Sequence, residues 1–106
     1  MDEIIRFGKL VSHPLRLRLL LCLLRRDLSK DEILAIFPKE SETKIEAQLD
    51  VLRRSDLISS RHHQRSSLYS LMEHRRNLLS SLVEAFHHDV DWDKELSQDL
   101  IRLRQL

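Results

Sequence analysis

The side chains best suited to chemistry form a basic segment in the middle of the chain. Residues 53–76 contain six arginines, three histidines and only two acidic residues. Four of the basic residues, Arg61, His62, His63 and Arg65, fall within five positions. Guanidinium and imidazolium groups bind phosphate oxygens, so this segment predicts a phosphate-binding surface. The alternative is an ordinary solvated face.

Acidic segments flank the basic one. Residues 39–52 hold two lysines against four acidic residues, and residues 84–106 hold three basic against six acidic residues. The formal net charge of +1 therefore hides an uneven distribution, and a phosphate-binding surface would be local.

A catalytic site is not expected. Ser29, Ser41 and Cys22 are the candidate nucleophiles, and none of them belongs to a recognisable motif with a histidine or a carboxylate. The single glycine excludes glycine-rich phosphate loops and dinucleotide fingerprints. Cys22 lies among leucines, which is typical of an inert core residue. The sequence therefore does not predict an enzyme.

Composition predicts one mainly helical domain that spans residues 1–106. Hydrophobic residues make up 42% of the chain and charged residues 33%, with five aromatic residues and two prolines. A single cysteine is typical of a reducing compartment, and the N-terminus has no basic signal segment. The longest apolar run, residues 19–24, is too short to span a bilayer. We therefore expect a cytoplasmic protein without a membrane partner.

Hydrophobic spacing predicts two helices in the first quarter of the chain. A short helical pattern covers residues 4–11. Ser12 is a good N-cap for the next helix, and Pro14 suits its first turn. Residues 15–24 are apolar on nearly every side of that helix, so we expect it to be buried in the middle of the domain.

Two shorter helices follow. Ser29 and Glu32 form a capping box that opens a helix, which Pro38 ends. Ser41 caps the next helix. Its apolar residues recur at i, i+4 and i+7: Ile45, Leu49 and Leu52. This helix is expected to stop near Ser55 and Asp56, because Asp tolerates the left-handed conformation that ends helices.

The last third of the chain changes period twice. Residues 57–71 alternate with a period near two around a polar tip at 61–65, which predicts a hairpin. Helical spacing returns from Met72, pauses at residues 89–91 and then resumes, which fits two terminal helices or one bent helix. The predicted fold class is therefore mainly α with a small β-hairpin (α+β), in the order α-α-α-α-β-β-α with an extra C-terminal helix.

This order of elements is the layout of a winged helix-turn-helix. Four stretches extend the likeness to particular residues: LVSHPLRLRLLLCLL, LSKDEILAIF, LDVLRRSDLISSR and RSSLYSL. Together they resemble the ArsR/SmtB family of bacterial and archaeal winged-helix repressors, over roughly residues 4–88.

The resemblance implies a homodimeric repressor that binds a palindromic operator in double-stranded DNA and is released by a small effector. In such dimers the first and last helices form the interface, which points here to the C-terminal helical part, residues 72–106, and to the N-terminal pattern. The matching apolar residues are Ile4, Ile5, Leu78, Leu82, Val83 and Phe86. The alternative is that the C-terminal segment folds back over its own apolar stripe.

The resemblance also predicts which residues contact DNA. They belong to the helix after the turn and to the hairpin tip: Lys39, Thr43, Lys44, Ala47, Gln48, Arg54, Arg61, His62, His63 and Arg65. Thr43 and Gln48 are the candidates for base readout, and the cations at the hairpin tip are candidates for phosphate contacts.

The helix after the turn departs from the family pattern. Glu42, Glu46 and Asp50 are spaced by four and so line one side of it, where carboxylates would repel phosphates. This departure leaves a second interpretation open, in which the chain keeps the winged-helix scaffold but binds a protein partner in place of DNA.

A metal-sensing repressor is the third interpretation. The family's thiolate site needs a Cys-x-Cys before the turn, and this chain has no cysteine there. Of the family's zinc pattern on the last helix, only His74 and His88 match. Two histidines from each of two subunits could supply the four ligands of a zinc ion. We nevertheless expect neither metal nor cofactor.

Overall fold

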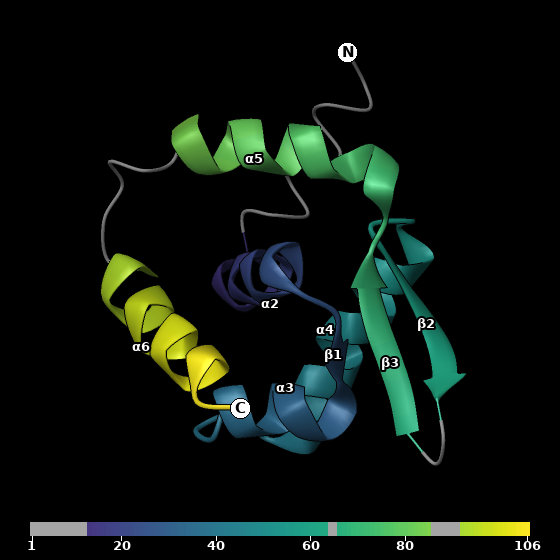
Figure 1. Ribbon diagram of the computed structural model, residues 1–106, viewed down its shortest axis with the longest axis vertical. Helices are drawn as coiled ribbons and strands as arrows, with labels where there is room; N and C mark the ends of the chain where they lie inside the picture. Colours follow the sequence, from purple (N-terminus) through teal and green to yellow (C-terminus); the bar gives the residue numbers. More distant parts are fainter. Residues whose placement is uncertain (1–12, 64–65, 86–91) are drawn as a thin grey trace.

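The computed structural model describes residues 13–63, 66–85 and 92–106. Its elements in chain order are α2 (Pro14–Arg25), β1 (Leu28–Ser29), α3 (Lys30–Ile36), α4 (Glu42–Arg54), β2 (Ile58–His63), β3 (Ser66–Leu71), η1 (Glu73–Arg75), α5 (Arg76–Ala85) and α6 (Trp92–Arg104) (Figure 1). The predicted fold class is confirmed. The helix expected over residues 4–11 lies outside the described residues. Among the described helices, none is long and apolar enough to cross a membrane.

Helix α2 lies at the centre of the molecule, with the other helices and the sheet around it (Figure 1). The prediction that it is buried is confirmed, since these residues are all buried: Leu15, Leu17, Leu19, Leu20, Leu21, Cys22 and Leu23. The prediction of Ser12 as N-cap is wrong. Pro14 with its fixed φ already begins the helix, so His13 is the N-cap, and its side chain makes no capping hydrogen bond.

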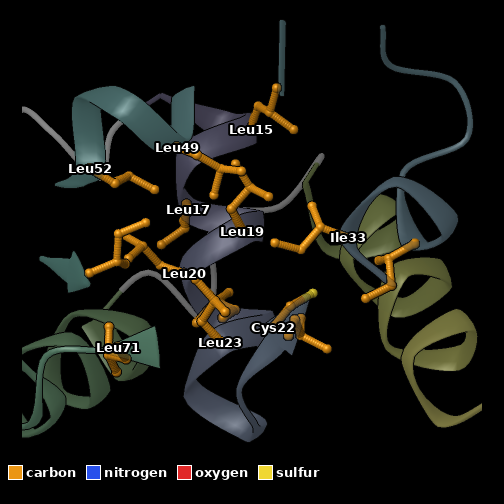
Figure 2. Close-up of a cluster of buried hydrophobic side chains, with 14 of the residues drawn as sticks. Leu15, Leu17, Leu19, Leu20, Cys22, Leu23, Ile33, Leu49, Leu52 and Leu71 are labelled. Atoms are coloured by element: carbon orange, nitrogen blue, oxygen red, sulfur yellow. The ribbon is translucent and has the colours of Figure 1, made fainter. Parts of the chain in front are cut away.

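Side chains from other helices and from the sheet converge on α2 to make one core (Figure 2). Leu49 and Leu52 come from α4, Ile33 comes from α3, and Leu71 comes from β3. Each fully buried leucine or isoleucine contributes about 1.5 to 3 kcal/mol relative to an exposed one. The core therefore fixes the positions of α3, α4 and the sheet relative to α2.

Local signals set the ends of α3 and α4 as the sequence predicts. The Ser29 hydroxyl accepts a hydrogen bond from the amide of Glu32 at 3.2 Å, and the Glu32 carboxylate accepts one from the amide of Ser29 at 3.0 Å. The Ser41 hydroxyl accepts from the amide of Lys44 at 3.1 Å. Asp56, just after α4, has a φ of 63°, the left-handed conformation expected at this helix end.

The hairpin is confirmed and is extended by a strand that the sequence did not predict. Strands β2 and β3 pair antiparallel, with Ile58 opposite Leu71 and His62 opposite Ser67. The two-residue strand β1 adds to the other edge of β3, so the sheet order is β1-β3-β2. A strand of two residues is too short to show any periodicity, so hydrophobic spacing could not predict it.

Helix α6 packs on α2 and α3 of its own chain through Leu96, Leu100 and Leu103. A buried ion pair holds it there. Asp99 is fully buried, and its two carboxylate oxygens accept hydrogen bonds from the guanidinium of Arg18 at 2.6 and 2.9 Å. This hydrogen bond raises the pKa of Arg18 above its ordinary value. The apolar side of α6 is therefore covered by the same chain.

We expect Asp99→Ala to lower the free energy of unfolding by about 3 to 5 kcal/mol, because it leaves the charge of Arg18 buried without its main partner. Urea denaturation followed by circular dichroism measures this loss. The double variant Arg18→Met/Asp99→Leu should recover most of it. Glu95→Gln is the matched control, since the Glu95 side chain is 61% exposed and its bond to Arg18 should matter by less than about 1 kcal/mol. An equal loss in Asp99→Ala and Glu95→Gln would contradict the assignment.

Candidate nucleic-acid interface

Helix α4 presents one face to solvent. Its buried residues, Ile45, Leu49 and Leu52, pack toward α2 and the sheet. Thr43 and Ala47 are exposed, and at this spacing they lie on the opposite side of the helix. Ser41 caps the start of α4, and the helix contacts β2 of the hairpin.

The acidic stripe predicted on α4 is present, and a lysine from α3 covers part of it. The ammonium of Lys30 lies 3.2 Å from the carboxylate of Glu42 and also forms an ion pair with Glu46. The hydrogen bonds to Glu46 and then to Glu42 raise the pKa of Lys30 above its ordinary value. These three side chains link the start of α3 to the first two turns of α4.

The remaining carboxylate of the stripe, Asp50, pairs with both arginines at the end of α4. Arg53 and Arg54 each lie 2.7 Å from its oxygens. The hydrogen bond from Arg53 is the main cause that holds the pKa of Asp50 below its ordinary value. Asp50 therefore stays ionised and holds the two guanidinium groups along the helix.

Two further residues predicted to contact DNA also have partners within the chain. Lys44 lies 3.1 Å from the carboxylate of Glu40, and the Gln48 amide oxygen accepts a hydrogen bond of 2.6 Å from Arg16 on α2. The α4 surface thus combines Lys30, Lys44, Arg53 and Arg54 with Glu40, Glu42, Glu46 and Asp50, four cations with four carboxylates. It is balanced in charge and not continuously basic.

Three of the predicted DNA-contact residues are exposed and make no ion pair within the part of the chain that the structure describes. They are Lys39 in the turn, and Arg61 and His62 on β2. Successive residues of a strand point to opposite faces, so His62 shares a face with Ser60 whereas Arg61 lies on the other face. Arg65 and the side chain of His63 lie outside the described residues.

A hollow of about 450 Å³ lies between part of α4 and the hairpin. Its lining residues are Thr43, Glu46, Ala47, Leu49, Asp50, Arg53, Ser60 and Tyr69. Its α4 wall carries two carboxylates of the acidic stripe, and its hairpin wall carries the half-buried Tyr69. The hollow joins the outward face of α4 to the hairpin into one surface.

The other predicted site residues are placed only in part. Leu78 on α5 is half-buried against the core, while the side chains of Leu82 and Val83, and all of Ile4, Ile5 and Phe86, lie outside the described residues. His74 is exposed and lies 3.6 Å from Asp56, and His88 lies outside the described residues. Among the described residues, no group of three or more His, Cys, Asp or Glu could hold a metal ion. The dimer interface and the zinc site stay predictions.

The sequence did not single out two residues that shape this surface. Lys30 and Arg16 reach α4 from α3 and α2, and each bonds to a residue at least 16 positions away. Such pairs leave no periodic signal in a single sequence. The capping box at Ser29 places Lys30 in the first turn of α3, but it does not indicate the direction of the lysine side chain.

The thiol of Cys22 is not accessible to reagents in solution. It is fully buried, and burial raises the pKa of its thiol to about 12. Because the thiolate is the reactive form, the thiol is inert at neutral pH, as the sequence predicts for a core residue.

We expect folded protein to resist an aromatic disulfide reagent at mildly alkaline pH, because Cys22 reacts only when the core opens. The release of the coloured thiolate measures the reaction, with protein in denaturing guanidinium chloride as the control. Equal rates in folded and denatured protein would show that Cys22 is accessible.

Solved structures with a similar fold come from transcriptional regulators. HlyU from Vibrio cholerae N16961 aligns with a TM-score of 0.71 and 22% identity, over 82% of this chain and 95% of that chain. The transcriptional regulator HlyU from Vibrio vulnificus CMCP6 aligns with a TM-score of 0.66 and 24% identity, over 77% and 85%.

A third structure is the homodimeric winged helix-turn-helix DNA-binding domain of Mb0332 from Mycobacterium bovis, described as a possible ArsR-family regulator. It aligns with a TM-score of 0.66 and 21% identity, over 85% of this chain and 88% of that chain. No protein-family model and no curated protein matches the chain. The likeness shows that this chain has the winged helix-turn-helix fold, as its resemblance to the ArsR/SmtB family implied.

Proposed function

We propose that this protein is a DNA-binding transcriptional regulator that acts in the cytoplasm. The observation that carries the proposal is the outward face of α4 beside an antiparallel hairpin, the arrangement with which winged helix-turn-helix proteins contact DNA. Arg61 on the hairpin and Lys39 in the turn supply cations for phosphates, and His62 adds an exposed imidazole. Thr43 and Ala47 face outward for base contacts.

A homodimeric repressor is the finer form of this proposal. Mb0332, one of the structural neighbours, is homodimeric, and α5 carries part of the apolar stripe expected at a dimer interface. Helix α6 is engaged with its own core, which leaves α5 and the N-terminal segment as the proposed interface. Two copies related by a two-fold axis would recognise a palindromic site.

Titration of the protein into the DNA upstream of its own gene and into unrelated duplex, at two salt concentrations, tests the proposal. Fluorescence anisotropy gives the affinity, and sedimentation gives the oligomeric state. Tighter, salt-sensitive binding to the upstream DNA is expected. A folded dimer that binds neither duplex at low salt would overturn DNA binding.

Arg61→Ala should weaken binding to every duplex and lower the slope of log affinity against log salt by about 0.9 per subunit, because one phosphate contact is lost. Arg104→Ala on α6 is the matched control, since it removes an exposed arginine that has no part in the proposed surface. An unchanged slope in Arg61→Ala would remove the hairpin from the mechanism.

Thr43→Ala should change the preference among sequences by about 1 to 3 kcal/mol, because it removes a hydroxyl from the outward face of α4. Competition with single-base variants of the bound site measures the preference. Thr43→Ser keeps the hydroxyl and should retain most of it. Equal weakening on all sequences would contradict base readout by Thr43.

A second candidate is a winged-helix module that binds a protein partner. The balanced charge of the α4 surface favours it, because the carboxylates of that surface would attract basic groups of a protein partner but repel the phosphates of DNA. This candidate becomes the leading one if the DNA titration shows no binding.

A further inference from the structure

Lys30 at the start of α3 pairs with two carboxylates of α4, within the proposed DNA surface. It follows β1, which pairs with β3 at Tyr69, and it reaches across to α4. Tyr69 and Glu46 line opposite walls of the hollow between the hairpin and α4. The Lys30 ammonium is therefore paired with a carboxylate, Glu46, that lines this hollow.

A DNA strand bound to both α4 and the hairpin would pass over the same hollow. Two carboxylates, Glu46 and Asp50, line it, and both are occupied by cations of the chain. A phosphate there must compete with these carboxylates for their cations. Exposed ion pairs of this kind are weak and exchange readily with other anions.

We propose, on the basis of the DNA-binding function above, that Lys30 is a phosphate-binding residue that Glu42 and Glu46 keep masked. The Glu42 side chain is 60% exposed and that of Glu46 is 50% exposed, so neither carboxylate is fixed in place by burial. When the charges of the two carboxylates are removed by substitution, the ammonium becomes available to a DNA phosphate. The pairs thereby lower the affinity of the surface for nucleic acid of any sequence.

The double variant Glu42→Gln/Glu46→Gln tests the mask, because glutamine keeps the shape of each side chain and removes its charge. Its slope of log affinity against log salt should rise by about 0.9 per subunit relative to wild type, since one phosphate contact is gained. A salt increase of about fourfold should then weaken the double variant about 3.5-fold more than wild type for each subunit bound.

Asp27→Asn/Asp31→Asn is the matched control. It likewise removes two negative charges, here from exposed carboxylates just before α3 and in its first turn that hold no cation in the described residues. We expect it to leave the salt slope unchanged. A rise as large as that of Glu42→Gln/Glu46→Gln would show a general effect of net charge and would overturn the proposal.

Combining Lys30→Ala with Glu42→Gln/Glu46→Gln discriminates best, because masking and simple repulsion predict opposite signs for the coupling energy between Lys30 and the two carboxylates. If Lys30 is unmasked, neutralising Glu42 and Glu46 helps binding more when Lys30 is present than when it is alanine. If the carboxylates merely repel DNA, their removal helps more in Lys30→Ala, where they are uncompensated. The sign of this coupling, measured in a double-mutant cycle, decides between the two.

The outcomes also separate this inference from the function on which it rests. Wild-type binding with an unchanged slope in Glu42→Gln/Glu46→Gln overturns the role of Lys30 alone. Binding that appears only in that double variant overturns DNA binding by the wild-type protein, and the sign of the coupling with Lys30→Ala then decides the role of Lys30. Absence of binding by wild type and double variant alike overturns both.

Discussion

Helix α2 can fold only if other elements cover it almost completely, because apolar side chains occupy most of its circumference. Helix α4 and the sheet cover one part, α3 and α6 another, and α5 adds the fully buried Leu79 to the same core. Arg18 is a charged residue within this helix, and only 12% of its side chain is exposed. Asp99 on α6 neutralises it, so the last helix both closes the core and satisfies its charge.

Arginines of α6 and α2 also contact the end of α3 and the turn of the helix-turn-helix. Arg102 on α6 donates a hydrogen bond of 3.2 Å to the carbonyl of Ile36, the last residue of α3, and the guanidinium of Arg18 lies 5.2 Å from the centre of the Phe37 ring. Contacts from α2 and α6 thus fix the start of the turn that leads into α4. The orientation of the outward face of α4 depends on a core contact that is remote in sequence.

Local signals in the sequence were sufficient to predict much of this fold. The capping box at Ser29, the cap at Ser41 and the left-handed Asp56 each depend on neighbouring residues, and each is present. The acidic stripe of α4 also follows from spacing alone. What spacing could not predict are the contacts between distant segments: the strand β1, the docking of α6, and the cations that cover the stripe. A single sequence carries no record of such pairs, because their energy arises only when the chain is folded.

The charge pattern of α4 has a consequence for selectivity. The cations of α4 and its neighbour Lys30 are already engaged by carboxylates, whereas Arg61, His62 and Lys39 at the edges of the surface hold no such partner in the described chain. A surface of this kind gains little from nucleic acid in general, since few counterions are released. If the protein binds DNA as proposed, such a surface would bind only weakly to DNA sequences other than its specific site.

The pairing of Arg18 with Asp99 joins positions 81 residues apart. Closing so long a loop costs entropy before the contact stabilises anything, so such contacts form late in folding. The hairpin and the capped helices depend on short loops and can form before it. During synthesis, α2 emerges well ahead of α6, and one side of its leucines stays uncovered in that interval. The newly made chain is then most in need of protection from aggregation, although the finished domain buries those leucines.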